Sequence, residues 1–284
     1  MNEEQIIIRA QREVAARHAA AQQHRQVVWR WLLPGFVIVV IVSFFAAPGD
    51  LPSKLLLAMS GVCALRPDHS YFAGDTQLPL ESRMLGIYGG FLLGLRVLLA
   101  AGRLGAQRVG NRVVLLTLVV LFGSMVFDGI NSTLADVGMP HLYTPTNLVR
   151  LLTGLFSGIA LAPVFLWLVG AVALPRTSRC QRDVLRSPAQ LLIPLIVGGL
   201  FALLVLAQHP LVYYPIALIS VGGVVALLAG VALLGTLMVW EFDGRVRHLQ
   251  QMVAPTSLAL LLVFAALGAM AFVRVLIPST VYAA

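Results

Sequence analysis

Residues 213–240 read YYPIALISVGGVVALLAGVALLGTLMVW, a run of 28 residues without a single Asp, Glu, Lys or Arg. A helix needs about 20 mostly apolar residues to cross the hydrocarbon layer of a bilayer, which is about 30 Å thick. The whole chain has the same character, because 59% of its 284 residues are hydrophobic and only 11% are charged. A water-soluble domain needs roughly a quarter charged residues to cover its surface. Lipid is therefore the expected solvent for most of this chain.

Other apolar segments of similar length lie on both sides of this run. We predict an all-α, polytopic membrane helix bundle of about seven transmembrane helices, at residues 31–48, 84–101, 113–128, 148–173, 190–207, 213–240 and 256–278. A further apolar stretch, residues 51–65, is too short to span comfortably. Its Pro52, Lys54 and Gly61 fit either a helix lying in the interface or a re-entrant segment.

The positive charges follow a pattern typical of membrane topology. A net charge of +8 suggests nucleic acid as one partner, but the basic residues lie in short loops between the apolar runs. Fourteen of the 20 Lys and Arg residues fall in residues 1–30, 102–112, 174–189 and 241–255, and four fall in the loops on the other side. Positive residues favour the cytoplasmic side. We therefore expect a protein of the cell (inner) membrane, with a cytoplasmic N-terminus, a C-terminus outside and no nucleic-acid partner.

The polar N-terminal segment, residues 1–30, is predicted to form a cytoplasmic amphipathic helix ahead of the bundle of residues 31–284. Ile7, Val14 and Val28 belong to a weak apolar seam that repeats every seven residues. Two interpretations remain open. The segment is either an interfacial helix near anionic headgroups or a docking helix for another membrane protein subunit.

Two arginines fall inside the predicted spans, and intramembrane charges often mark an ion or proton pathway. Arg96 and Arg274 each lie within about two turns of a helix end. A long arginine side chain can extend that far to the interface, so we expect both to do so. Cys63 and Cys180 fall in loops on opposite sides of the predicted membrane, which indicates that they do not pair with each other.

The polar residues that require an explanation gather in two outer loops and the helix ends beside them. The motifs are Cys63-Ala-Leu-Arg66-Pro67-Asp68-His69-Ser70-Tyr71-Phe72, Gln77-Leu78-Pro79-Leu80-Glu81-Ser82-Arg83, Gly86-Ile87-Tyr88, Asp128-Gly129, and Asn147, Arg150 and Thr153-Gly154. In these motifs, over residues 63 to about 158, the chain resembles an uncharacterised family of prokaryotic polytopic membrane proteins, the domain of unknown function 2085. The resemblance implies a topology and the location of a site, but no reaction.

The chain departs from the family pattern at two positions. Ala64 stands where the family usually has His, and Glu81 replaces a second family Cys. These departures weaken any thiol or metal chemistry. Cys63, His69, Asp75 and Glu81 also match no standard zinc spacing. We therefore expect no metal and no cofactor.

The candidate site is an outer-face polar cluster of Arg66, His69, Arg83, Asp128, Asn147 and Arg150. One interpretation is an anion clamp, because arginines at helix N-termini suit a phosphate or carboxylate. The other is structural: Asp128 pairs with Arg83 or Arg150 and ties three helices together.

Three classes of function are compatible with this sequence. The favoured one is a non-catalytic scaffold or accessory subunit of a larger membrane complex, with partners possible through residues 1–30. The alternative is a small transporter or a binder of lipid phosphate or another anion at the arginine cluster. A membrane-embedded enzyme would need a nucleophile or base that the sequence does not identify.

Overall fold

The structure is a computed structural model that describes residues 9, 13, 34–40, 42–46, 48–174, 180–239 and 252–276. The predicted N-terminal helix, residues 1–30, therefore lies outside the described residues apart from Arg9 and Glu13, which are helical. Its interfacial or docking role stays a prediction.

Six described helices are long and apolar enough to cross a membrane, which confirms the all-α, polytopic bundle. They contain α3 (Ser82–Ala100), α4 (Arg112–Asp136), α5 (Asn147–Ala173), α6 (Leu192–Leu206), α7 (Tyr213–Val239) and α8 (Val253–Leu276), and the span of α6 reaches the required length from Pro188. Two short 3-10 helices, η3 (Pro188–Leu191) and η4 (Pro210–Val212), lead directly into α6 and α7.

The first predicted span takes a different form from the other six. Its described part, Pro34–Ala46, is helical and is followed by the short helix α2 (Leu51–Met59) at a bend of 120°. Lys54 of α2 donates to the carbonyl of Phe45 at 2.8 Å, so its charge stabilises the end of the preceding helix. A seventh span is counted only if this bent pair is taken as one span.

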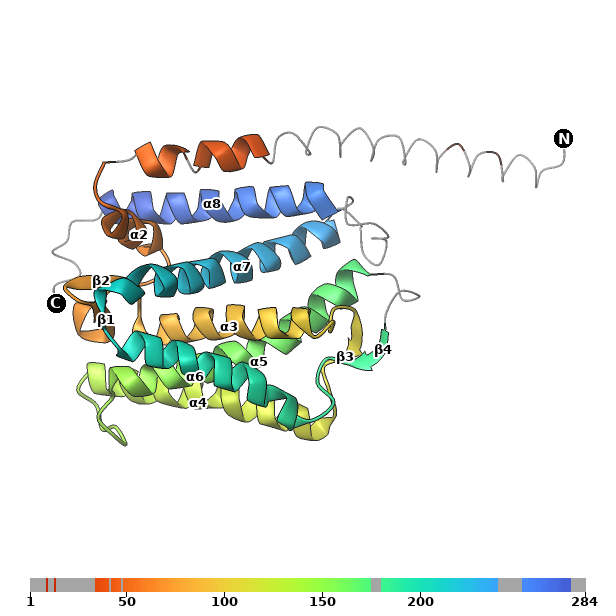
Figure 1. The fold of residues 1–284 in the computed structure, drawn as a ribbon, viewed down its shortest axis with the longest axis horizontal. Coiled ribbons are helices and arrows are strands. Elements are labelled where there is room, and N and C mark those ends of the chain that lie inside the picture. The colour runs from red at the N-terminus through yellow and green to blue at the C-terminus, as the bar shows by residue number, and fades with distance from the viewer. Residues whose placement is uncertain are drawn as a thin grey trace.

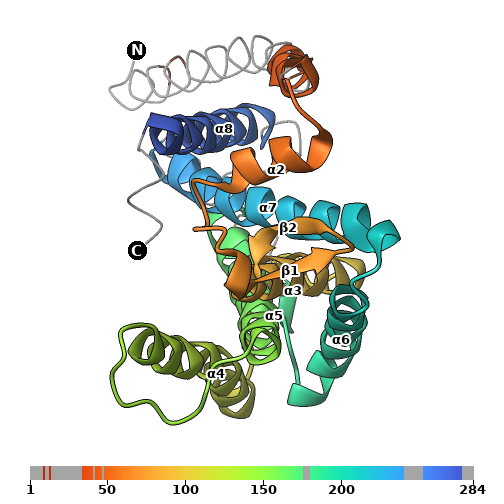
Figure 2. The same ribbon diagram turned by 90° about the vertical axis from the view of Figure 1, so that its left-hand side faces the viewer.

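The helices lie side by side, and small strands mark the two ends of the bundle (Figure 1). Strands β1 (Ser70–Ala73) and β2 (Thr76–Glu81) lie with α2 at one end, here called the hairpin end. Strands β3 (Ala106–Arg108) and β4 (Cys180–Asp183) pair in parallel at the other end. Figure 2 looks onto the hairpin end, with α3 in the middle, α7 and α8 on one side and α4 and α6 as outer helices.

Glycines bring α3 and α5 into the closest packing of the bundle. A Cβ at Gly90 would lie 2.6 Å from the carbonyl oxygen of Leu155, and one at Gly158 would lie 2.7 Å from the backbone nitrogen of Phe91. Small residues four apart on both helices are the usual way for membrane helices to approach this closely. The sequence contains that pattern in both helices, at Gly86, Gly90 and Gly94 and at Gly154, Gly158 and Ala162.

The antiparallel hairpin β1–β2 differs from the loop that the sequence analysis predicts here. Its signal is the pair Gly74-Asp75 between two apolar stretches, which is a two-residue hairpin turn. Gly74 has φ +61°, a conformation that glycine adopts without steric cost. Leu78 and Leu80 of β2 are fully buried and fix the hairpin onto the bundle. A hydrogen bond provides a second attachment, because the backbone nitrogen of Gly74 donates to the carbonyl of Gln208 at 2.7 Å.

Helix α4 is longer than predicted and runs on from residue 128 to Asp136. The polar residues Asn131, Ser132 and Thr133 lower the hydropathy there, so the apolar pattern alone ends near residue 128. In the structure these side chains find partners. Asn131 holds the following loop, and the Thr133 hydroxyl donates to the carbonyl of Gly129. The two extra turns place further polar groups at the hairpin end.

Arg274, near the end of α8, binds backbone carbonyls. Its guanidinium donates to the carbonyls of Ser60, Cys63 and Ala64 at 2.9, 3.0 and 2.6 Å. These carbonyls follow α2, where the helix leaves its last acceptors unsatisfied and attracts a cation. Arg274 therefore joins α8 to the end of α2. The sequence predicts only that its side chain extends to the interface, and does not predict these contacts.

Candidate functional site

The centre of the polar cluster is an ion pair between α3 and α4. Arg83 opens α3, and its Nη2 lies 2.7 Å from Oδ2 of Asp128, whose side chain is only 1% exposed. The same nitrogen donates to the Ser132 hydroxyl at 2.9 Å. Since Asp128 and Ser132 are one turn apart on α4, Arg83 fixes a definite register between the two helices.

Asp128 also accepts hydrogen bonds from the opposite side. The Tyr143 hydroxyl donates to Oδ1 at 2.6 Å, and the Thr153 hydroxyl of α5 donates to Oδ2 at 3.3 Å. Partial burial and the bond to Asp128 raise the pKa of Tyr143 to about 12, so its hydroxyl stays protonated and remains a donor. The carboxylate thus has donors from α3, from the loop before α5 and from α5 itself. Because this buried carboxylate has hydrogen-bond donors on several sides, it stabilises the packing of these elements.

A second set of ion pairs surrounds Asp136, at the end of α4. Arg66 donates to Oδ2 of Asp136 at 3.3 Å, and Arg150 of α5 lies 3.8 Å from Oδ1. Glu81 accepts a hydrogen bond from the backbone nitrogen of Arg66 at 3.0 Å. The family departure at Glu81 therefore contributes a carboxylate to the cluster. Asp136 connects the loop before the hairpin with α4 and α5.

His69 and Asn147 complete the set. Burial lowers the pKa of His69, and the positive charges of Arg150 and Arg66 lower it further, so the ring is neutral at neutral pH. Asn147, the first residue of α5, donates to the carbonyl of Asp68 at 3.0 Å and accepts from Arg150 at 3.4 Å. The amide therefore attaches the hairpin loop to the start of α5.

The cluster encloses a small cavity in which the charges are matched. The cavity has a volume of about 90 Å³ and is lined by Arg66, His69, Glu81, Arg83, Ser132, Thr133, Asp136 and Arg150. Ligand sites for small molecules are usually about 300–1,000 Å³. Three arginines (Arg66, Arg83, Arg150) are matched by three carboxylates (Glu81, Asp128, Asp136), so the cluster has no surplus positive charge.

All six predicted site residues lie in this one cluster, and of the two partners foreseen for Asp128 the structure selects Arg83, while the partner of Arg150 was not foreseen. Asp128 pairs with Arg83, and Arg150 pairs with Asp136. The sequence reasoning missed Asp136, Ser132 and Tyr143. A usable signal existed for the first two, because residues 128, 132 and 136 share one face of a continuous helix. Tyr143 carries no comparable signal, since the path of its loop decides its contact.

Cys63 and Glu81, two of the residues considered as metal ligands, have hydrogen-bond partners within the protein. Within the described ranges, no group of three or more His, Cys, Asp or Glu side chains could hold a metal ion. Cys63 is buried after α2, and its sulfur accepts a hydrogen bond from the backbone nitrogen of Glu81 at 3.4 Å. Burial raises the pKa of the Cys63 thiol, which disfavours the reactive thiolate.

The fold and the cluster define a multi-pass, helical membrane protein. A model of the family described as predicted membrane protein (DUF2085) matches residues 63–164, which confirms the resemblance inferred from the motifs. The matched segment contains α3, α4 and the entire polar cluster. Neither the curated proteins nor the solved structures contain a match to this chain.

Proposed function

We propose that this chain is a non-catalytic integral membrane protein that acts as a scaffold or accessory subunit of a larger complex in the cell (inner) membrane. The observation that carries the proposal is the position of α4. Only 17% of the most apolar stretch of α4 is buried inside the bundle, whereas 50% of the corresponding stretch of α5 is buried. An apolar groove of about 530 Å³ runs between α4 and α5, lined by Val119, Phe122 and Gly123 among others.

A groove of this kind suits a transmembrane helix of another subunit. Membrane helices associate through close packing of side chains and small residues, because lipid provides no hydrophobic driving force between them. Gly123 lies in the groove with open space within 4 Å of its Cβ position. A partner helix can therefore approach the α4 backbone closely at this point.

The polar cluster supports the same proposal. Its arginines and carboxylates neutralise each other and join the hairpin loop, α3, α4 and α5. A cluster with this charge balance stabilises a rigid platform. It holds α4 at the edge of the bundle, where a partner can reach the groove.

Two neighbouring valines on α4 allow a matched test. Val119 lines the groove and Val120 does not, although the two are 65% and 62% exposed. The full chain would be purified in mild detergent, and its co-purifying proteins identified and counted by mass spectrometry. We expect a stoichiometric partner with the wild type and with Val120→Trp, and its loss with Val119→Trp. Equal recovery with both variants, or no stoichiometric partner at all, would contradict the proposal.

The predicted docking role of residues 1–30 can be tested in the same preparation. Deletion of residues 1–26 leaves Arg30 and the first apolar run in place. The shortened chain should insert and fold as before, because the first apolar run begins near Arg30. If the segment docks a partner, that partner disappears while the groove partner remains.

Anion binding at the arginine cluster is the second candidate, and one observation favours it. Nε of Arg83 is buried and has no hydrogen-bond partner in the described part of the chain. The matched charges and the small cavity count against it. Titration of the purified protein with inorganic phosphate separates the two functions. Phosphate should leave the melting temperature unchanged, whereas a rise that Arg150→Gln abolishes would support an anion site.

A further inference from the structure

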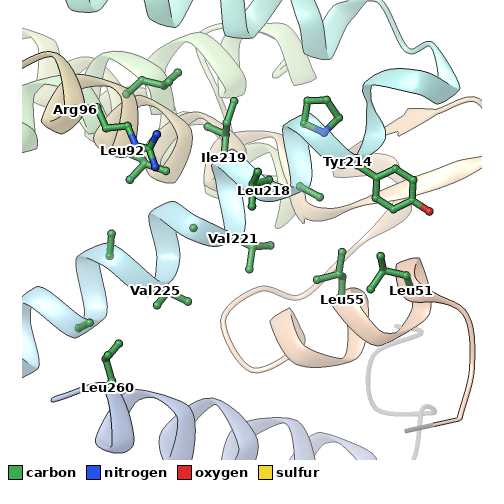
Figure 3. A pocket seen from close by; sticks show the side chains of 16 residues that line it. Leu51, Leu55, Leu92, Arg96, Tyr214, Leu218, Ile219, Val221, Val225 and Leu260 are labelled. Carbon is green, nitrogen blue, oxygen red and sulfur yellow. The ribbon is translucent and has the colours of Figure 1, made fainter. Parts of the chain in front are cut away.

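A large apolar groove shares no lining residue with the cavity of the polar cluster. It has a volume of about 1,100 Å³ and lies between α2, α3, α7 and α8. Figure 3 shows its walls, which include Leu55 of α2, Leu92 of α3, Leu218 and Val225 of α7, and Leu260 of α8. The walls are almost entirely aliphatic, so the groove suits a hydrocarbon chain.

The groove contains one charged side chain among the described residues that line it. Arg96 projects into it from α3 (Figure 3). Its position four residues before the end of α3 places it about 6 Å from that end of the helix. Arg96 is exposed and has no ion pair or hydrogen bond with the part of the chain that the structure describes. From this position the long side chain can reach the level of the lipid headgroups, where a guanidinium attracts an anionic headgroup.

The opposite end of the groove has a different polar group. Tyr214 lies there, at the start of α7, with its hydroxyl at the tip of the ring (Figure 3). Tyrosines are enriched at the boundary between lipid and water. The lining residues of α7 run from Tyr214 to Ala229, a distance of about 22 Å along the helix. Half of the hydrocarbon layer is about 15 Å thick, so the groove is long enough for the acyl chain of one leaflet.

We propose that this groove is a binding site for an anionic membrane lipid, with an acyl chain along α7 and the headgroup phosphate paired with Arg96. The groove supplies apolar contact for the chain, and the guanidinium supplies a charge-assisted hydrogen bond to the phosphate. A second copy of this protein fits less well. Its net charge of +8 would oppose its approach to Arg96.

Native mass spectrometry of the full chain in detergent tests the site. The protein is titrated with phosphatidylglycerol or with phosphatidylcholine of the same acyl chains. We expect one site that prefers phosphatidylglycerol about fivefold, the effect of one arginine on one negative headgroup. Arg96→Gln should remove the preference without weakening phosphatidylcholine binding. Arg96→Lys should retain it, as should Arg103→Gln, which removes a charge outside the groove.

A steric pair of variants tests whether the lipid lies in the groove. Val225 lines it, whereas Val231 is exposed on the same helix outside it. Val225→Trp should reduce binding of both lipids, and Val231→Trp should not. Three results would overturn the proposal: an unchanged preference in Arg96→Gln, unchanged lipid binding in Val225→Trp, or a dimer that Val225→Trp converts to a monomer with lipid binding intact. None of these readouts depends on a partner protein at the α4 groove.

Discussion

At the scale of single residues, Asp128 is the group on which the hairpin end depends. Its carboxylate is buried and receives donors from Arg83, Tyr143 and Thr153. Removing one partner of a buried ion pair leaves the other charge uncompensated, and this loss exceeds the net value of the intact pair. The effect of a substitution at Asp128 therefore depends on whether Arg83 is still charged.

We predict that Asp128→Asn lowers the free energy of unfolding by about 2 kcal/mol, a reduced loss because Arg83 is partly exposed. Adding Arg83→Gln should recover part of the lost free energy, with a coupling energy between the two substitutions of about 1 kcal/mol or more. SDS titration of the purified variants would measure both values. Asp75→Asn, in the exposed hairpin turn, is the matched control and should change little. Strictly additive losses would show that the pair does not tie α3 to α4.

At the scale of elements, the approach of α3 and α5 positions most of the cluster. Close contact through Gly86, Gly90, Gly154 and Gly158 sets the relative height of the two helices. That height brings Arg83 at the start of α3 and Arg150 at the start of α5 to the same end of the bundle. The packing of two glycine faces thus determines where the charges meet.

A side chain at Gly158 should force these helices apart. Gly158→Ala places a methyl group against the carbonyl of Ile87 and within 2.7 Å of the backbone nitrogen of Phe91. We predict a loss of about 1–3 kcal/mol in the free energy of unfolding, the usual cost of overpacking. Gly123→Ala is the control, since its Cβ would have nothing within 4 Å, and it should be neutral or slightly stabilising. An unchanged melting temperature for Gly158→Ala would refute the close packing.

The spans and the site residues could be predicted because apolar length and unpaired polar residues are local features. Five of the predicted spans begin and end within a few residues of α3, α5, α6, α7 and α8. The end of α4 could not be predicted from hydropathy, since its polar last turns are stabilised by contacts with α3 and a distant loop. The pairing of Arg150 with Asp136 depends on that extension. The hairpin is harder to predict, because its strands have only four and six residues and its one local signal is the turn Gly74-Asp75.

At the scale of the whole molecule, the bent pair before α3 decides the topology. Pro34–Ala46 packs beside α8, with the rings of Phe36 and Phe264 6.2 Å apart, and α2 then turns across the hairpin end (Figure 2). If Pro34–Ala46 belongs to a full span, the chain crosses seven times and its ends lie on opposite sides. The excess of arginine in residues 1–30 favours a cytoplasmic N-terminus. The polar cluster would then face outward.

Labelling of single cysteines in intact cells with a membrane-impermeant reagent tests this topology most directly. The cysteines would be placed one at a time in a cysteine-free background, at Asn2, at Asp75 in the hairpin turn and at Ala284. We predict labelling at positions 75 and 284 before lysis, and at position 2 only after lysis. Labelling of position 2 before lysis, together with positions 75 and 284, would contradict the seven-span account and leave six spans.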